Sequence, residues 1–370
     1  MAKKHNYITP EFQMVLAIVK NIIFNTNTPL PAVSYDSNKL LQYFTQNNLN
    51  TFIAGHIDNF PELTELKKGI VIRAKKSLTK NLLLQADLLR IIDLAKENKI
   101  NLVLFKGHPV NEMIYGNSNH RTSTDVDICV PPTELLLMEK LLLEKGYTED
   151  SRNLQLNDKE FELFLKNDNE KGYFSPTKSK VDVHFKLFKN PYILPLPTIE
   201  SDYLIRTTYC NRAIYRMNNA YTLLYLISHG KIHYWEKMMW LIDIVYFLRK
   251  FNEEELIELF ELAKKNKLDQ VLLGTISLCN VAFDMPIPQV FESKISNKQA
   301  PYVLQGLKSL ASNKTTKLSK WKQRVFMKSD LKFFLYQISL FPSRDMKIVK
   351  IPFAKRLLYP LLRPITYILS

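Results

Sequence analysis

The stretch Arg121-Thr-Ser-Thr-Asp125-Val-Asp127-Ile-Cys-Val130 decides the fold class of this chain. From Asp125 onward polar and apolar residues alternate, which predicts a β-strand with one polar and one apolar face. Pro131 and Pro132 follow, and prolines close a strand because they cannot donate to its ladder. On this strand the two aspartates share a face about 6–7 Å apart, and carboxylates that close repel each other unless a cation lies between them.

Short segments on both sides of this stretch predict a small sheet. The apolar run 101–105 ends at Lys106-Gly107, as expected of a buried strand that stops at a turn. Further strands are predicted at 161–165 and 180–188, with turns at 171–172 and 175–176 between them. Helices are predicted at 109–115 and 133–145, the second ending at Gly146.

The flanking regions have helical periodicity instead. Residues 1–99 are predicted to be an N-terminal helical region, 100–192 the sheet-containing core, and 193–370 a C-terminal helical region with a basic tail. The fold class is therefore α+β (α/β), with a small mixed sheet flanked by helical regions.

A third carboxylate completes a candidate metal site. Asp182 lies in Val181-Asp-Val-His-Phe185, which also alternates like a strand. If this strand pairs with the one carrying Asp125 and Asp127, three carboxylates converge. Ligands that are all oxygen suit Mg²⁺ or Mn²⁺, and two such ions can clamp the attacking and leaving oxygens of a phosphoryl transfer.

These motifs resemble the nucleotidyltransferase superfamily of the DNA polymerase β type, and in particular a poorly characterised bacterial branch. The similar segments are Phe105-Lys106-Gly107, Arg121-Thr-Ser-Thr-Asp125-Val-Asp127, Val181-Asp182-Val-His184, and Ser228-His229-Gly230 followed by Trp235, Trp240, Leu241 and Asp243. The resemblance is strongest over residues 101–188 and looser elsewhere.

The resemblance implies roles for the aspartates and for the glycine turn. Asp125 and Asp127 would ligate both metals, while Asp182 would ligate the catalytic metal and help to deprotonate the acceptor hydroxyl. In the superfamily the turn reads Gly-Gly-Ser or Gly-Ser and holds the nucleotide phosphates. This chain has Lys106-Gly107-His108, so that Lys106 or His108 would supply the phosphate contact as a charge in place of the serine hydroxyl.

Other polar residues near the motifs leave two interpretations open. Arg121 is placed to reach a phosphate or to neutralise the carboxylates, and is otherwise a surface arginine. His184 shares a strand face with Asp182 and is either a substrate-side or a packed core residue. His229 and Asp243 are interpreted as helix-packing or substrate-side residues, and Trp235 and Trp240 as core.

Charge and composition indicate which kinds of partner and which cellular location fit this chain. The net charge is +15, and residues 301–370 hold fourteen Lys and Arg against two acids. This basic tail favours a polyanionic acceptor such as RNA or a phosphorylated carrier. Packing of the tail on the protein body is favoured over peripheral membrane contact because Pro360 and Pro364 interrupt any amphipathic helix. Three widely spaced cysteines and an N-terminus without a signal peptide pattern favour a cytoplasmic protein. The resemblance implies that it binds ATP or another NTP.

The sequence thus supports two main functions. The first is metal-dependent transfer of a nucleoside monophosphate from an NTP to a hydroxyl of a protein, peptide, small molecule or RNA, with release of pyrophosphate. The second is a catalytically weakened module of the same fold that binds nucleic acid or a protein partner, favoured by the missing serine after Gly107. A third hypothesis, that the chain is an amphitropic membrane protein acting through its C-terminal tail, is based on composition alone.

Overall fold

The computed structural model describes residues 8–116, 120–151, 153, 158–312, 320–321 and 324–341. The predicted basic tail lies mostly outside these residues. The described helices are α1 (Pro10–Phe24), α2 (Ser37–Gln46), α3 (Asn50–Ala54), α4 (Thr64–Glu97), α5 (His108–Tyr115), α6 (Leu135–Glu144), α7 (Asp158–Asn167), α8 (Asn219–Ile232), α9 (Met238–Leu248), α10 (Glu253–Lys265), α11 (Asp269–Phe283), α12 (Gln289–Glu292), α13 (Ala300–Ser312) and α15 (Leu331–Ser339).

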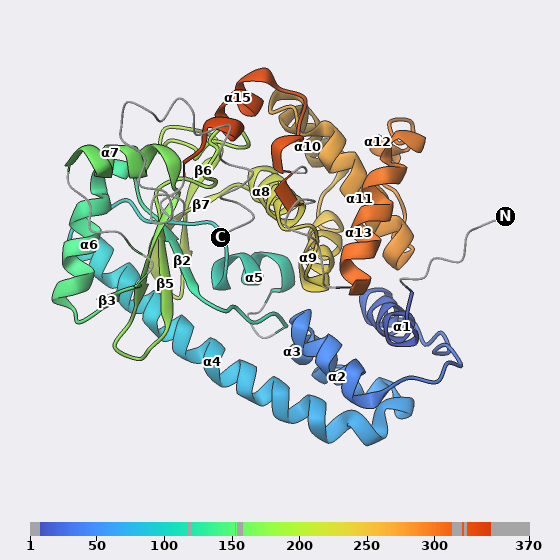
Figure 1. The fold of residues 1–370 in the computed structure, drawn as a ribbon. Helices are drawn as coiled ribbons and strands as arrows, with labels where there is room; N and C mark the ends of the chain where they lie inside the picture. Colours follow the sequence, from blue (N-terminus) through green and yellow to red (C-terminus); the bar gives the residue numbers. More distant parts are fainter. Residues whose placement is uncertain are drawn as a thin grey trace. The chain divides into compact units, whose positions relative to one another are not determined.

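The strands are β1 (Val103–Leu104), β2 (Val126–Cys129), β3 (Thr148–Glu149), β4 (Glu170–Phe174), β5 (Lys180–His184), β6 (Leu204–Tyr209) and β7 (Arg212–Met217). They form a seven-stranded sheet in the order β3-β4-β5-β2-β1-β7-β6 (Figure 1). β2 and β5 are parallel, as are β1 and β7, and the other neighbours are antiparallel. The predicted fold class, a mixed sheet flanked by helices, is confirmed.

The chain divides into two units. The first contains Met1–Lys80, Asn111–Thr122 and Leu226–Thr315, and the second contains Asn81–Val110, Ser123–Tyr225 and Thr316–Ser370. The sheet belongs to the second unit. Among the described residues, no helix combines the length and the apolar composition that crossing a membrane requires.

The second unit has its core on one face of the sheet. Alternation along β2 and β5 buries Val126, Ile128, Val181 and Val183 in a cluster that also includes α4 and α6 residues such as Leu88, Ile91, Leu135 and Met138. Figure 1 shows α4 and α6 running alongside the strands. The same alternation turns Asp127 and Asp182 to the opposite face.

The first unit is helical. In this unit α11 packs on α13, α10 and α1, and α1 also packs on α2. Trp235 is fully buried and its Nε1 donates to the Tyr302 hydroxyl over 3.0 Å. The assignment of Trp235 to the core is therefore confirmed.

Two local predictions were wrong. Residues 161–165 lie in helix α7, not in a strand, because Phe161, Phe164 and Leu165 all reach the core at helical spacing. The predicted turn at 171–172 lies inside β4, where Gly172 pairs directly with Asp182. The turn at Ser175-Pro176 is present between β4 and β5.

Candidate metal and nucleotide site

Three carboxylates meet at the centre of the sheet, in the second unit. β2 and β5 pair in parallel with Asp127 opposite Asp182, so the two side chains project side by side from the same face. Asp125 precedes β2 and reaches the same place. One ligand oxygen from each of the three aspartates lies within 4.8 Å of the others. The structure thus brings together the three residues that the sequence singled out.

The donor set suits a hard divalent cation. All three ligands are carboxylate oxygens, with no thiol or imidazole nitrogen among them, and this chemistry favours Mg²⁺ or Mn²⁺ over zinc. The pairing partner of Asp182 on β4 is Gly172, where a Cβ would lie 3.3 Å from Asp182 Oδ1 and 3.1 Å from the Asp150 side chain. The absence of a side chain at position 172 leaves room for the Asp182 carboxylate.

Asp127 is held by two donors on one oxygen. Lys106 Nζ lies 2.6 Å and His184 Nε2 3.0 Å from Asp127 Oδ1. Burial raises the pKa of Asp127, but the charge of Lys106 and the hydrogen bond and charge of His184 more than offset it and hold the pKa well below its usual value. Asp127 is therefore ionised, with both donors on Oδ1.

His184 is itself positioned by a neighbouring strand. Its Nδ1 lies 3.3 Å from Asn169 Nδ2 and 3.4 Å from Glu170 Oε2, and its ring contacts Phe105 edge-on at a centroid distance of 4.9 Å. These contacts fix the imidazole against Asp127 in the manner of outer groups that orient metal ligands. His184 thus belongs to the site as a buried residue.

Lys180 spans the other two carboxylates. Its Nζ contacts Asp182 Oδ2 and lies 4.0 Å from Asp125 Oδ2. Burial and the charge of Glu170 raise the pKa of Asp182 to about 6 despite Lys180. Burial and Asp127 likewise raise the pKa of Asp125, against the opposing charges of Lys106 and Lys180. The site contains more negative charge than its own lysines neutralise.

The glycine turn has the expected shape, with different side chains around it. Gly107 has φ +75°, a conformation that favours glycine, and Ser123 Oγ lies 3.7 Å from where its Cβ would be. The buried Ser123 hydroxyl has no hydrogen-bond partner among the described residues. His108 Nε2 lies 3.0 Å from the Asn81 carbonyl oxygen, so this ring is anchored to α4.

Arg121 belongs to the first unit and has partners there. Its Nε lies 2.8 Å from Asp243 Oδ2, and its Nη1 donates to Asn111 Oδ1 over 3.0 Å. Asp243 is almost fully buried and also accepts from the Tyr115 hydroxyl over 2.6 Å. The aspartate of the Trp-x-x-Asp segment thus anchors Arg121 within the first unit.

His229 also lies in the first unit. Its ring contacts His233 at a centroid distance of 4.5 Å and Trp240 at 5.2 Å. These contacts are those of a helix-packing residue, one of the two roles that the sequence left open. The substrate-side role of His229 stays a prediction.

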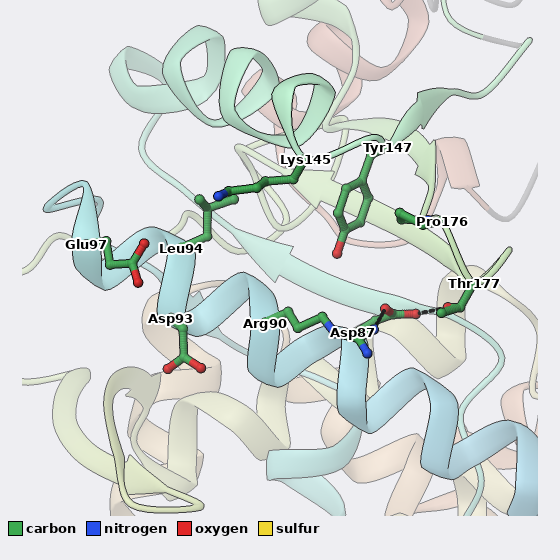
Figure 2. A pocket seen from close by; sticks show the side chains of 9 residues that line it. All are labelled: Asp87, Arg90, Asp93, Leu94, Glu97, Lys145, Tyr147, Pro176 and Thr177. Carbon is green, nitrogen blue, oxygen red and sulfur yellow. Dashed lines mark hydrogen bonds and ion pairs between the residues drawn. The ribbon is translucent and has the colours of Figure 1, made fainter.

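A separate cavity of about 450 Å³ lies in the second unit against α4 (Figure 2). It is lined by Asp87, Arg90, Asp93, Leu94, Glu97, Lys145, Tyr147, Pro176 and Thr177. Since α4 covers the apolar face of the sheet, this cavity is not the place where the three aspartates meet. Asp87 lies at its wall and accepts from Ser175 Oγ and Thr177 Oγ1, which ties the turn between β4 and β5 to α4.

The combination of a mixed sheet, two carboxylates on paired strands with a third just before β2, and a glycine turn defines a candidate metal-dependent phosphoryl-transfer centre. Residues 34–284 match the family described as uncharacterised nucleotidyltransferase, and the chain belongs to this family. Neither the curated proteins nor the solved structures contain a significant match to the chain.

Two charged residues of the site escaped sequence reasoning. Lys180 stands two positions before Asp182 on the same strand, and this period-2 spacing signals a shared face. Glu170 lies in a segment whose Lys171-Gly172 pair was interpreted as a turn, so its approach to His184 had no sequence signal. The partnership of Arg121 with Asp243 joins segments too far apart in sequence to be predicted from a pattern.

Proposed function

We propose that this protein is a metal-dependent nucleotidyltransferase that moves a nucleoside monophosphate from an NTP to an acceptor hydroxyl. The convergence of Asp125, Asp127 and Asp182 is the single observation that carries this proposal. Membership of a nucleotidyltransferase family supports an NTP as the donor.

Mg²⁺ or Mn²⁺ bound by the three aspartates would supply positive charge at the attacking and leaving oxygens. The acceptor oxygen bonds to the α-phosphorus as the bond from that phosphorus to the pyrophosphate oxygen breaks. Asp182 takes up the acceptor's proton, a role supported by its raised pKa of about 6. Lys106 and His184 hold Asp127 ionised and oriented.

The phosphates require donors other than the usual serine of the glycine turn. Lys106 is bound to Asp127, and His108 contacts the Asn81 carbonyl. The Ser123 hydroxyl, which lies against Gly107, is a candidate replacement for the missing hydroxyl. Arg121 remains a candidate phosphate contact, although in the structure its charge is matched by Asp243.

The acceptor is proposed on charge alone. A polyanionic acceptor, RNA or a phosphorylated carrier, suits the basic C-terminal tail, of which residues 342–370 lie outside the described part of the chain. A cytoplasmic location is part of the proposal and is supported by the three cysteines, which are free thiols.

The proposal is tested by incubating the protein with each α-labelled NTP, Mg²⁺ or Mn²⁺, and fractionated cell extract. Wild type is expected to label an extract component and release pyrophosphate, and the double variant Asp125→Asn/Asp127→Asn is expected to do neither. Metal-dependent NTP binding without transfer to any fraction would favour the alternative, a weakened binding module of the same fold. Absence of both binding and transfer would contradict the proposal.

A further inference from the structure

The three aspartates of the site have two internal counter-cations, and these differ in their surroundings. Lys106 contacts Asp127, whose side chain is 5% exposed, and lies over the Phe105 ring at 5.5 Å from its centroid. Lys180 contacts Asp182 and approaches Asp125, whose side chain is 28% exposed. Lys180 therefore contacts the two carboxylates that include the more exposed Asp125, while Lys106 contacts the buried Asp127; the two lysine side chains themselves are 27% and 23% exposed.

The oxygens that Lys180 occupies belong to two of the three candidate metal ligands. The contacts of Lys106 and His184 with Asp127 are both to Oδ1, an arrangement that is compatible with a cation on the other oxygen. Lys180, in contrast, places a positive charge between Asp125 and Asp182, where the ligand oxygens converge. A divalent ion and the Lys180 ammonium repel each other and compete for the same two carboxylates.

We propose that Lys180 couples metal binding to nucleotide binding, holding Asp125 and Asp182 in the metal-free protein and binding the triphosphate once a cation takes its place. The inference rests on the proposed function, because it concerns the metals and the NTP of that site. A lysine suits this exchange, since its ammonium is a point charge on a long, flexible stem and binds phosphates well.

The exchange has a thermodynamic consequence. Lys180 weakens the binding of a cation alone, because its own ion pairs must be broken first. It strengthens the binding of nucleotide in the presence of the cation, because the released ammonium gains a new counter-charge. By linkage, the cation and the nucleotide each raise the affinity for the other by the same factor, and part of that factor is due to Lys180.

Binding measurements on four proteins test this coupling without relying on turnover. Wild type is compared with Lys180→Met, with Lys180→Arg, which keeps the charge, and with Lys140→Met. Lys140 is an exposed lysine of α6 paired with Glu144, so its loss matches the change in net charge away from the site. Two affinities are measured by calorimetry, that for Mn²⁺ alone and that for α,β-methylene-ATP at saturating Mn²⁺.

In Lys180→Met, the affinity for Mn²⁺ alone is expected to rise about tenfold and the affinity for the analogue to fall about tenfold, within the usual range of coupling factors. Lys180→Arg and Lys140→Met are expected to resemble wild type. Thermal unfolding gives a second measurement. Without metal, the Tm of Lys180→Met should be lower than that of wild type. Saturating Mn²⁺ should raise the Tm of Lys180→Met by more than it raises the Tm of wild type.

Equal Mn²⁺ affinity in Lys180→Met and wild type would overturn the coupling role while leaving the proposed function standing. A fall in Mn²⁺ affinity in Lys180→Met would also overturn it, because the lysine would then be a supporting group. Absence of Mn²⁺ binding in all four proteins would overturn both this inference and the proposed metal-dependent function.

Discussion

Asp127 on β2 and Asp182 on β5 are paired neighbours on adjacent parallel strands, so the sheet itself sets the spacing of two of the three carboxylates. Hydrogen bonding along β2 and β5 fixes this register, and a one-residue slip would turn one aspartate to the apolar face. Asp125 joins them from the position just before β2. The geometry of the candidate metal site is therefore a property of the sheet core.

The pH dependence of metal binding follows from Asp182. A proton and a cation compete for this carboxylate, whose pKa is raised to about 6 by burial and by Glu170. Mn²⁺ affinity is expected to rise as pH increases toward 6 and to level off above it, as measured by calorimetry between pH 5 and 8. Glu170→Gln should move the midpoint downward; an unchanged midpoint would contradict this account.

The raised pKa of Asp182 also affects the free energy of unfolding, which changes with pH in the opposite direction to the Mn²⁺ affinity. The folded protein holds the Asp182 proton more tightly than the unfolded chain, whose ordinary pKa is 3.8. Without metal, the contribution of this group to the free energy of unfolding therefore decreases as pH rises from about 4 to 6. Saturating Mn²⁺ should remove this decrease, because the cation stabilises the ionised carboxylate.

His184 is expected to tune metal affinity through Asp127. His184→Gln removes the imidazole that lies 3.0 Å from Asp127 Oδ1. Mn²⁺ affinity should fall by about 10–100-fold, the usual effect of losing a group that orients a metal ligand. The control is His56→Gln, a half-buried histidine of the first unit. Equal Mn²⁺ affinity in His184→Gln and the control would show that His184 only fills space.

Asp87 is expected to anchor the turn before Lys180 and Asp182. Burial raises the pKa of Asp87, but the hydroxyls of Ser179, Thr177 and Ser175, together with Arg90, more than offset it, so the group is ionised at neutral pH. Asp87→Ala should cost about 1–3 kcal/mol, because the buried hydroxyls lose their acceptor.

Amide hydrogen exchange shows where in the structure Asp87→Ala lowers stability. In Asp87→Ala, the amides between β4 and β5 should exchange faster than in wild type. Asp93→Ala is the matched control, since Asp93 lines the same cavity (Figure 2) but pairs with Arg212 in a half-exposed ion pair, and such pairs contribute little to stability. Unchanged exchange in the turn would refute the anchoring role.

Asp243 is expected to matter more for stability than for chemistry. Asp243→Ala leaves the mostly buried Arg121 guanidinium without its charge partner and should cost about 3–5 kcal/mol. Tyr115→Phe, which removes only one hydrogen bond to Asp243, should cost about 1 kcal/mol. Thermal unfolding of both variants distinguishes the two costs, and similar losses in both would contradict the ion-pair role.

Much of the site could be predicted from sequence because it depends on local periodicity. Alternation along 125–130 and 181–185 predicted two strands carrying the aspartates, and glycine at 107 marked the turn; in the structure Asp127 and Asp182 lie on β2 and β5, and Asp125 lies just before β2. The pairing of the two strands could not be derived from either segment alone, since register is set by tertiary packing.

The errors have physical causes too. A five-residue apolar run such as 161–165 fits a strand or one turn of a buried helix equally well, and contacts with the core decide between them. Gly172 has a strand position because a neighbouring carboxylate needs the space, a reason that becomes visible only when Asp182 is seen opposite it.

The central claim is that Asp125, Asp127 and Asp182 hold the cation through which nucleotide binds. Calorimetric titration of the four NTPs into wild type and Asp127→Asn, each with Mn²⁺ or with EDTA, tests it most directly, with Asp93→Asn as a surface control. The account predicts binding of at least one NTP by wild type and the control only with Mn²⁺, and binding about 10–100-fold weaker by Asp127→Asn. NTP binding that is equally tight in Asp127→Asn, or in wild type with EDTA, would contradict it.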